Sequence, residues 1–247
     1  DRWAKAPLND GKADETFSSP AEFAKFWESN AMFTDAWTAV HAGAFRGKKV
    51  LDVGAGYARQ SFVFALHGAY VTHLDVVPKV SFKLGLSFVF VFLPIYLLLL
   101  QNLERIKMLA KHYKIEDRIR TVFLSDVHSA ETALEGEVFD VVLFFGSMHH
   151  MPREYIRKEV HMYFKHMRPG SRLIQLAYPS SRWICYQGGL TFPEFCASTD
   201  GNCPWAEWYD LEKALDTFHP FKFAVNYAGV VGPHEFTWWD LVLLGEK

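Results

Sequence analysis

Residues 50–60 constrain the fold more than any other part of this sequence. They read VLDVGAGYARQ, in which a short apolar run at residues 49–53 leads into Gly-Ala-Gly. The run predicts a strand buried on both faces, and residues 58–67 predict a helix. Paired glycines between a strand and a helix let the backbone turn tightly and approach a ligand. The sequence therefore predicts an α/β domain with a ligand-binding turn.

The residues of this turn distinguish between classes of cofactor. The dinucleotide fingerprint G-x-G-x-x-G/A ends in a small residue that packs the helix on the strand. Here Gly54 and Gly56 are followed by Arg59 at that place, and Asp52 stands two residues before the first glycine. A carboxylate there does not suit a pyrophosphate, but it suits an ammonium group held through hydrogen bonds or water. The turn therefore argues against a nicotinamide dinucleotide.

Asp-x-Gly-x-Gly at the end of a first strand resembles motif I of the class I S-adenosylmethionine-dependent methyltransferases. The resemblance implies a single doubly wound, mostly parallel seven-stranded sheet, with helices on both faces and an antiparallel last strand. It also implies S-adenosylmethionine as the cofactor, with Asp52, Gly54 and Gly56 in its binding turn. The resemblance covers residues 50–178 apart from one apolar run. It covers the tail only in the order of its elements, and the N-terminal region hardly at all.

Two further strand ends carry cofactor-binding candidates. Residues 70–74 predict a second strand that finishes at Asp75, 21 residues after Gly54. An acid at that distance is placed to bind ribose hydroxyls, and Val76 would then lie against adenine. The alternative is a simple carboxylate in a strand-end turn. A third strand at residues 120–124 precedes Asp126 and Val127. The resemblance implies that Asp126 bonds the adenine amino group, and a helix cap or turn aspartate remains the alternative.

The fourth predicted strand, at residues 139–145, leads into candidates for catalysis. It continues as Phe145-Gly146, and His149 and His150 follow shortly after. This segment resembles motif IV of the same family, which lines the methionine moiety and the methyl acceptor. Methyl transfer depends mainly on alignment, and a base is needed only when the acceptor must lose a proton. His149 and His150 are the candidates for that base, and a structural role in the turn is the alternative.

Residues 80–101 do not fit this pattern. They form an apolar run of 22 residues with Lys83 as the only charge, which approaches the length of a membrane span. A span here would divide one hydrogen-bonded sheet across the bilayer, so we do not expect one. An interfacial hairpin remains open, although the apolar residues surround any helix drawn through the run.

The apolar run also has the marks of a retained intron. Without it, residues 75–79 join residues 102–113 as strand end, turn and amphipathic helix. Lys79-Val80-Ser81 can be encoded by a splice-donor sequence, and the leucine-rich end can be a pyrimidine tract before Gln101. An intron would indicate a eukaryotic gene. A genuine insertion is the alternative, and sequencing of the transcript distinguishes the two.

The remaining elements complete one predicted domain over residues 1–247. Residues 1–46 are expected to form a helical cap, and residues 179–204 an acceptor-side loop. Helices are expected at residues 153–167 and 204–218, a turn at residues 168–171, and strands at residues 172–178, 221–227 and 236–244. Trp238 and Trp239 are adjacent, so they should point to opposite faces of the last strand.

Composition indicates which classes of partner and which cellular compartment to expect. The net charge of −2 gives no electrostatic case for nucleic acid, and a small-molecule acceptor is expected. The three cysteines are an odd number, which favours a reducing, cytoplasmic compartment, although the chain begins without Met and organellar targeting stays open. No Cys/His spacing matches a metal site. Three alternative functions stay open: a methyltransferase, a catalytically silent methyltransferase-like partner module, and a nicotinamide-dependent oxidoreductase.

Overall fold

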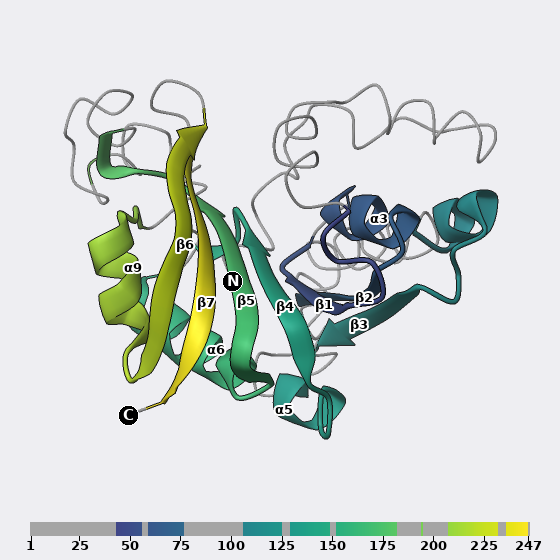
Figure 1. The fold of residues 1–247 in the computed structure, drawn as a ribbon, viewed down its shortest axis with the longest axis horizontal. Helices are drawn as coiled ribbons and strands as arrows, with labels where there is room; N and C mark the ends of the chain where they lie inside the picture. Colours follow the sequence, from purple (N-terminus) through teal and green to yellow (C-terminus); the bar gives the residue numbers. More distant parts are fainter. Residues whose placement is uncertain are drawn as a thin grey trace, which may run out of the picture. The chain divides into compact units, whose positions relative to one another are not determined.

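The protein has an α/β fold built on one mixed β-sheet. The computed structural model describes residues 43–55, 59–76, 106–124, 129–148, 152–181, 194, 207–231 and 236–246. Its strands are β1 (Lys49–Val53), β2 (Tyr70–Val76), β3 (Ile119–Leu124), β4 (Phe139–Phe145), β5 (Met167–Ala177), β6 (Phe221–Val231) and β7 (Phe236–Glu246). Its helices are α3 (Arg59–Leu66), α5 (Ser129–Ala133), α6 (Arg153–Phe164) and α9 (Leu211–Phe218), together with helical residues 106–113. Figure 1 shows the elements with these labels.

The strand order is β3-β2-β1-β4-β5-β7-β6. β1 pairs in parallel with β4, β2 with β3, and β4 with β5. β7 lies between β5 and β6 and runs antiparallel to both. The predicted seven-stranded, mostly parallel sheet with an antiparallel last strand is therefore confirmed.

The chain divides into two compact units. One unit comprises Asp1–Lys49 and Ala55–Ala133, and the other comprises Val50–Gly54 and Leu134–Lys247. In the first unit, Phe64 of α3 packs on Phe45 at a ring-centroid distance of 5.6 Å, and Phe62 lies 6.5 Å from Tyr113. The expectation of a single domain over residues 1–247 stays a prediction.

Aromatic side chains fill the core of the second unit. Phe164 of α6 meets the rings of Phe144, Phe218, Phe221 and Phe223, at centroid distances between 5.1 and 6.5 Å. These rings come from β4, α9 and β6, so one side chain joins three elements. Edge-on contacts of this kind add to the stability that burial provides.

Several element boundaries differ from those that the sequence predicts; α6, for example, ends at Phe164 and not at residue 167. The turn expected at residues 168–171 is part of β5, and the register with β4 shifts between Phe139 and Val141. Ser171 donates its hydroxyl to the Phe139 carbonyl oxygen at 2.8 Å, which ties the irregular segment to β4. The last helix begins at Leu211, because the Asp210 carboxylate caps it by accepting the Lys213 N–H at 2.8 Å.

Candidate functional site

Gly54 follows β1 directly and has a backbone conformation that only glycine adopts readily. Its φ is +66°, and a β-carbon added there would lie 2.7 Å from the Ser147 β-carbon. Ser147 follows β4, so the two strand ends approach each other too closely for any side chain at Gly54. The first glycine of the turn is therefore required by the chain's own packing as well as by its φ.

Asp52 lies within β1, two residues before Gly54. It is fully buried, and its strand neighbour in β4 is Leu143. The carboxylate therefore faces protein atoms and not solvent. This burial favours an indirect role toward a ligand, through water or through the shape of the turn.

The end of β4 supplies three adjacent groups. Phe145 is half-buried and is the last residue of the strand. Gly146 follows with φ +73° and donates its N–H to the Leu176 carbonyl oxygen of β5 at 2.9 Å. The Ser147 hydroxyl is buried and has no hydrogen-bond partner within the described part of the chain. A buried, unsatisfied hydroxyl at a strand end is a group that a ligand can satisfy.

Ser147 was not among the residues that the sequence singled out. The signal that could have found it is its position, a small polar residue immediately after the strand-end glycine. That position does not show the packing of Ser147 against Gly54, which depends on the fold.

Asp75 stands near the end of β2, as the spacing predicts. It is half-buried and pairs with Phe123 of β3, and Val76 is the last residue of the strand. The Ala55 N–H, one residue beyond Gly54, points to the Leu74 carbonyl oxygen at 3.4 Å. This contact brings Ala55 beside the end of β2, within one compact unit.

His73 is a buried titratable residue that the sequence analysis did not consider. Its Nδ1 lies 3.3 Å from the Ser61 hydroxyl of α3, and its ring meets Phe123 edge-on. Its Nε2 has no hydrogen-bond partner among the residues described. Burial lowers the pKa of His73 from 6.5 to about 4, so the ring is neutral at physiological pH. It is a core histidine under α3 and not a ligand-facing group.

Two more buried polar groups belong to the region around the end of β5. The Gln175 side-chain amide is fully buried, and neither its nitrogen nor its oxygen has a partner in the described segments. The Tyr209 hydroxyl is likewise unpaired there, and burial together with the Glu207 charge raises the pKa of Tyr209. The Tyr209 N–H donates to the Tyr178 carbonyl oxygen at 2.9 Å, which places residue 209 beside the end of β5.

The other predicted site residues are Gly56, Asp126, Val127, His149 and His150, and all of them lie outside the described residues. The apolar run at residues 80–101 lies outside them as well. Among the residues described, no three His, Cys, Asp or Glu side chains are grouped to hold a metal ion. No helix in the described ranges is long and apolar enough to cross a membrane.

Neither a protein-family model nor a curated protein sequence matches this chain significantly. Solved structures do match. An O-methyltransferase family protein from Burkholderia thailandensis gives a TM-score of 0.57 at 12% identity, covering 90% of this chain and 59% of that one. The chain thus spans 59% of the length of that protein.

Two shorter proteins match over nearly their whole length. Magnesium protoporphyrin IX methyltransferase from Synechocystis, with bound S-adenosylhomocysteine, has a TM-score of 0.54 and 15% identity, covering 98% of this chain and 92% of that one. The 1,6-didemethyltoxoflavin-N1-methyltransferase from Burkholderia thailandensis has a TM-score of 0.50 and 18% identity, with coverage of 95% and 93%. At these identities the likeness establishes the fold, which is that of the class I methyltransferases.

Proposed function

We propose that this chain transfers a methyl group from S-adenosylmethionine to a small-molecule acceptor. The observation that carries the proposal is the strand order, with antiparallel β7 between β5 and β6. The order 3-2-1-4-5-6 of the classic dinucleotide-binding fold has no such strand. Two matching structures of this fold hold S-adenosylhomocysteine, and one of them also holds a small-molecule acceptor.

The residues at the end of β1 and β4 fit the cofactor's amino-acid part. Gly54 has no side chain to obstruct an approaching ligand, and Ser147 offers a buried hydroxyl without a partner among the described residues. In this proposal the Ser147 hydroxyl and the backbone of Gly54 and Gly56 hold the methionine moiety. Asp52 supports the ammonium group indirectly, since its side chain is fully buried.

Asp75 is assigned to the ribose hydroxyls. A half-buried carboxylate at a strand end can accept two hydrogen bonds from neighbouring hydroxyls. Val76 and Val127 would line the adenine ring, and Asp126 would accept from its amino group. Phe145 and Gly146 then border the place where the cofactor and the acceptor meet.

The acceptor side is assigned to the segment after β4 and to residues 179–204. When bound, the cofactor would supply a methyl group on a sulfonium, whose sulfur leaves as a neutral thioether. The protein's part is to align the acceptor atom with that methyl group and to exclude water. His149 or His150 removes a proton where the acceptor carries one on the reacting atom.

Two alternative functions differ from this proposal in the ligand that the protein binds or in whether it turns substrate over. A catalytically silent module would bind the cofactor, or nothing, without turnover. A nicotinamide-dependent oxidoreductase would bind a dinucleotide, but Arg59 in place of a small residue and the antiparallel β7 both oppose it.

Calorimetry and methyl labelling test the proposal together. The protein is titrated with S-adenosylmethionine, S-adenosylhomocysteine and nicotinamide dinucleotides, and we expect the first two to bind. It is then incubated with methyl-labelled S-adenosylmethionine and a cell extract separated into small-molecule, protein and nucleic-acid fractions. Label in the small-molecule fraction supports the proposal. Dinucleotide binding, label in a macromolecular fraction, or cofactor binding without any transfer would each contradict it.

A further inference from the structure

Two arginines converge on Gly68, the residue that precedes β2 by two positions. Arg118 donates from Nη1 to the Gly68 carbonyl oxygen at 2.9 Å. A β-carbon added to Gly68 would lie 3.2 Å from Cγ of Arg46 and 3.9 Å from Nη1 of Arg118. Both side chains therefore lie against Gly68, and they come from segments that are far apart in the sequence. Gly68 itself has φ +97°, which only glycine adopts without strain.

An exposed aromatic side chain borders Arg118, and an exposed leucine lies two residues before Gly68 in the sequence. Arg118 stacks over the Tyr70 ring, with its guanidinium carbon 5.3 Å from the ring centroid. Tyr70 is nevertheless 47% exposed, and Leu66 at the end of α3 is 41% exposed. Tyrosine and arginine together are typical of the central contacts in protein–protein interfaces.

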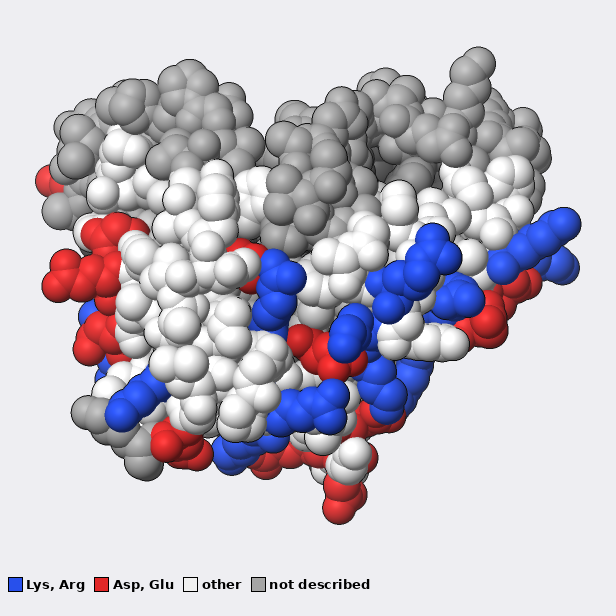
Figure 2. Space-filling model, in the orientation of Figure 1, with Lys and Arg blue, Asp and Glu red and all other residues white. Residues whose placement is uncertain are grey.

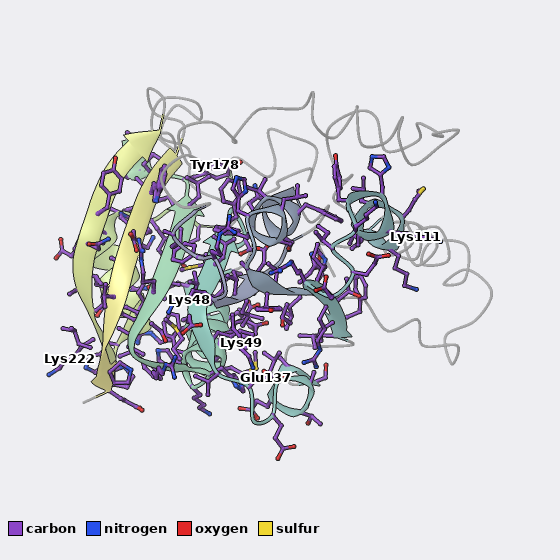
Figure 3. The ribbon with its side chains drawn as sticks, turned by 45° about the vertical axis from the view of Figure 1, so that its right-hand side comes forward. Lys48, Lys49, Lys111, Glu137, Tyr178 and Lys222 are labelled. Carbon is purple, nitrogen blue, oxygen red and sulfur yellow. The ribbon has the colours of Figure 1, made fainter. Side chains whose placement is uncertain are left out.

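Further cations surround the pair at the amino ends of β1 and β3. Residues 46–49 and 114–120 contain six Lys or Arg and two acidic residues, although the whole chain has a net charge of −2. Arg46, Lys48 and Lys114 form no ion pair with any residue of the described segments. Figure 2 shows Lys and Arg side chains gathered over the part of the molecule that contains β2 and β3. Figure 3 labels Lys48 and Lys49 at the start of β1.

We propose that this surface, formed by Arg46, Lys48, Leu66, Tyr70 and Arg118 and called the basic edge, docks an acidic segment of a partner protein. The argument is charge complementarity: uncompensated cations attract carboxylates and select against basic partners. Guanidinium groups match carboxylates in planar, two-point contacts. The exposed Tyr70 and Leu66 add the apolar contact that a protein partner provides.

Two other anionic partners fit less well. A single strand of nucleic acid binds mainly by stacking successive bases on aromatic side chains, and the basic edge offers Tyr70 alone for that contact. A lipid surface would favour a broader basic face with more apolar side chains than Leu66 and Tyr70. A short acidic segment needs only the local cluster.

The basic edge lies at the opposite end of β2 from Asp75. Tyr70 and Asp75 are five positions apart along the strand, which corresponds to about 16 Å. A partner docked at the basic edge therefore leaves the proposed ribose contact open. Docking and cofactor binding can be measured independently, so that failure of one proposal does not decide the other.

The test uses a fluorescently labelled deca-glutamate peptide and the full chain, with fluorescence anisotropy at physiological ionic strength. We expect saturable binding that weakens with added salt, because the contacts are ionic. The double variant Arg46→Glu/Lys48→Glu should weaken binding by ~10-fold or more, since it reverses two charges at the contact. Neither side chain forms an ion pair within the described chain, so the variant is expected to fold; its melting curve verifies this.

Lys222→Glu is the matched control, because Lys222 is an exposed cation of β6 outside the basic edge (Figure 3). It should leave deca-glutamate affinity unchanged. Tyr70→Ala tests the apolar part of the surface and should also weaken binding. Absence of binding, an equal loss in Lys222→Glu, or tighter binding of a ten-nucleotide RNA or of phosphatidylserine vesicles than of the peptide would overturn the proposal.

Discussion

Gly54 and Ser147 pack against each other so closely that a β-carbon on Gly54 would lie 2.7 Å from the β-carbon of Ser147. The contact joins the turn after β1 to the turn after β4. Both turns contain residues that the sequence assigns to the cofactor. The same glycine thus serves the packing of two strand ends and the approach of a ligand.

Gly54→Ala should destabilise the protein and not only impair ligand binding. The substitution combines a left-handed backbone with a steric clash, and we expect a loss of ~2 kcal/mol or more in the free energy of unfolding. Gly136→Ala is the matched control, because Gly136 has φ +73° but nothing within 4 Å of its added β-carbon. Chemical denaturation measures the free energy of unfolding of both variants, and the difference between their losses is the contribution of the steric clash. The double variant Gly54→Ala/Ser147→Gly should recover part of the loss, and the absence of any recovery would contradict the contact.

Asp75→Ala should weaken S-adenosylmethionine binding by ~1.5–3 kcal/mol, the range of hydrogen bonds to a charged group. Calorimetry measures the affinity, and a melting curve verifies that the variant is folded. Asp117→Ala removes an exposed carboxylate of the same compact unit and serves as the control. Equal affinities for the two variants would remove Asp75 from the site.

His149→Ala and His150→Ala should leave cofactor affinity nearly intact. If the acceptor must lose a proton, one of the two variants should lower turnover by ~10²-fold or more. Single-turnover rates at several pH values separate proton removal from alignment. Small and equal effects of both substitutions would show that alignment alone suffices.

Burial of neutral His73 should make the protein acid-sensitive. Because its folded-state pKa is about 4, below the value of 6.5 outside the fold, the unfolded chain binds an extra proton between these values. Stability is therefore unaffected by this group above pH 6.5 and falls as the pH drops toward 4, by up to ~3 kcal/mol.

Urea denaturation between pH 4 and 7 measures the slope, which is the change of the free energy of unfolding with pH. His73→Asn keeps a polar atom near Ser61 but does not titrate, so its stability should vary less with pH than that of the unchanged protein. His112→Gln alters an exposed histidine of the same unit and should leave the slope unchanged. An unaltered slope in His73→Asn would assign the acid sensitivity to other groups.

Deletion of residues 80–101 should give a more soluble protein that binds S-adenosylmethionine better. The elements on both sides of the run complete the fold without it, and its sixteen Val, Leu, Ile, Phe and Tyr side chains would otherwise need cover. Thermal melting of both proteins, with and without cofactor, measures the effect. If the shortened chain unfolds or loses binding, the run is a native part of the fold.

The sequence by itself determined the features that depend on neighbouring residues. The bounds of β1 and β4 coincide with their predicted ranges, because continuous apolar runs ended by glycine define buried strands locally. The position of Asp75 near the end of β2 could likewise be predicted, because Asp75 follows the short apolar run that predicts this strand. The strand order followed from the resemblance that these local motifs carry.

The tertiary structure decided what depends on residues distant in the sequence. The expected turn at residues 168–171 became part of β5, because the Ser171 hydroxyl finds the Phe139 carbonyl oxygen of another strand. Ser147 became important through its contact with Gly54, and His73 through burial under α3. Such contacts form only when the chain brings separate segments together, so no local pattern encodes them.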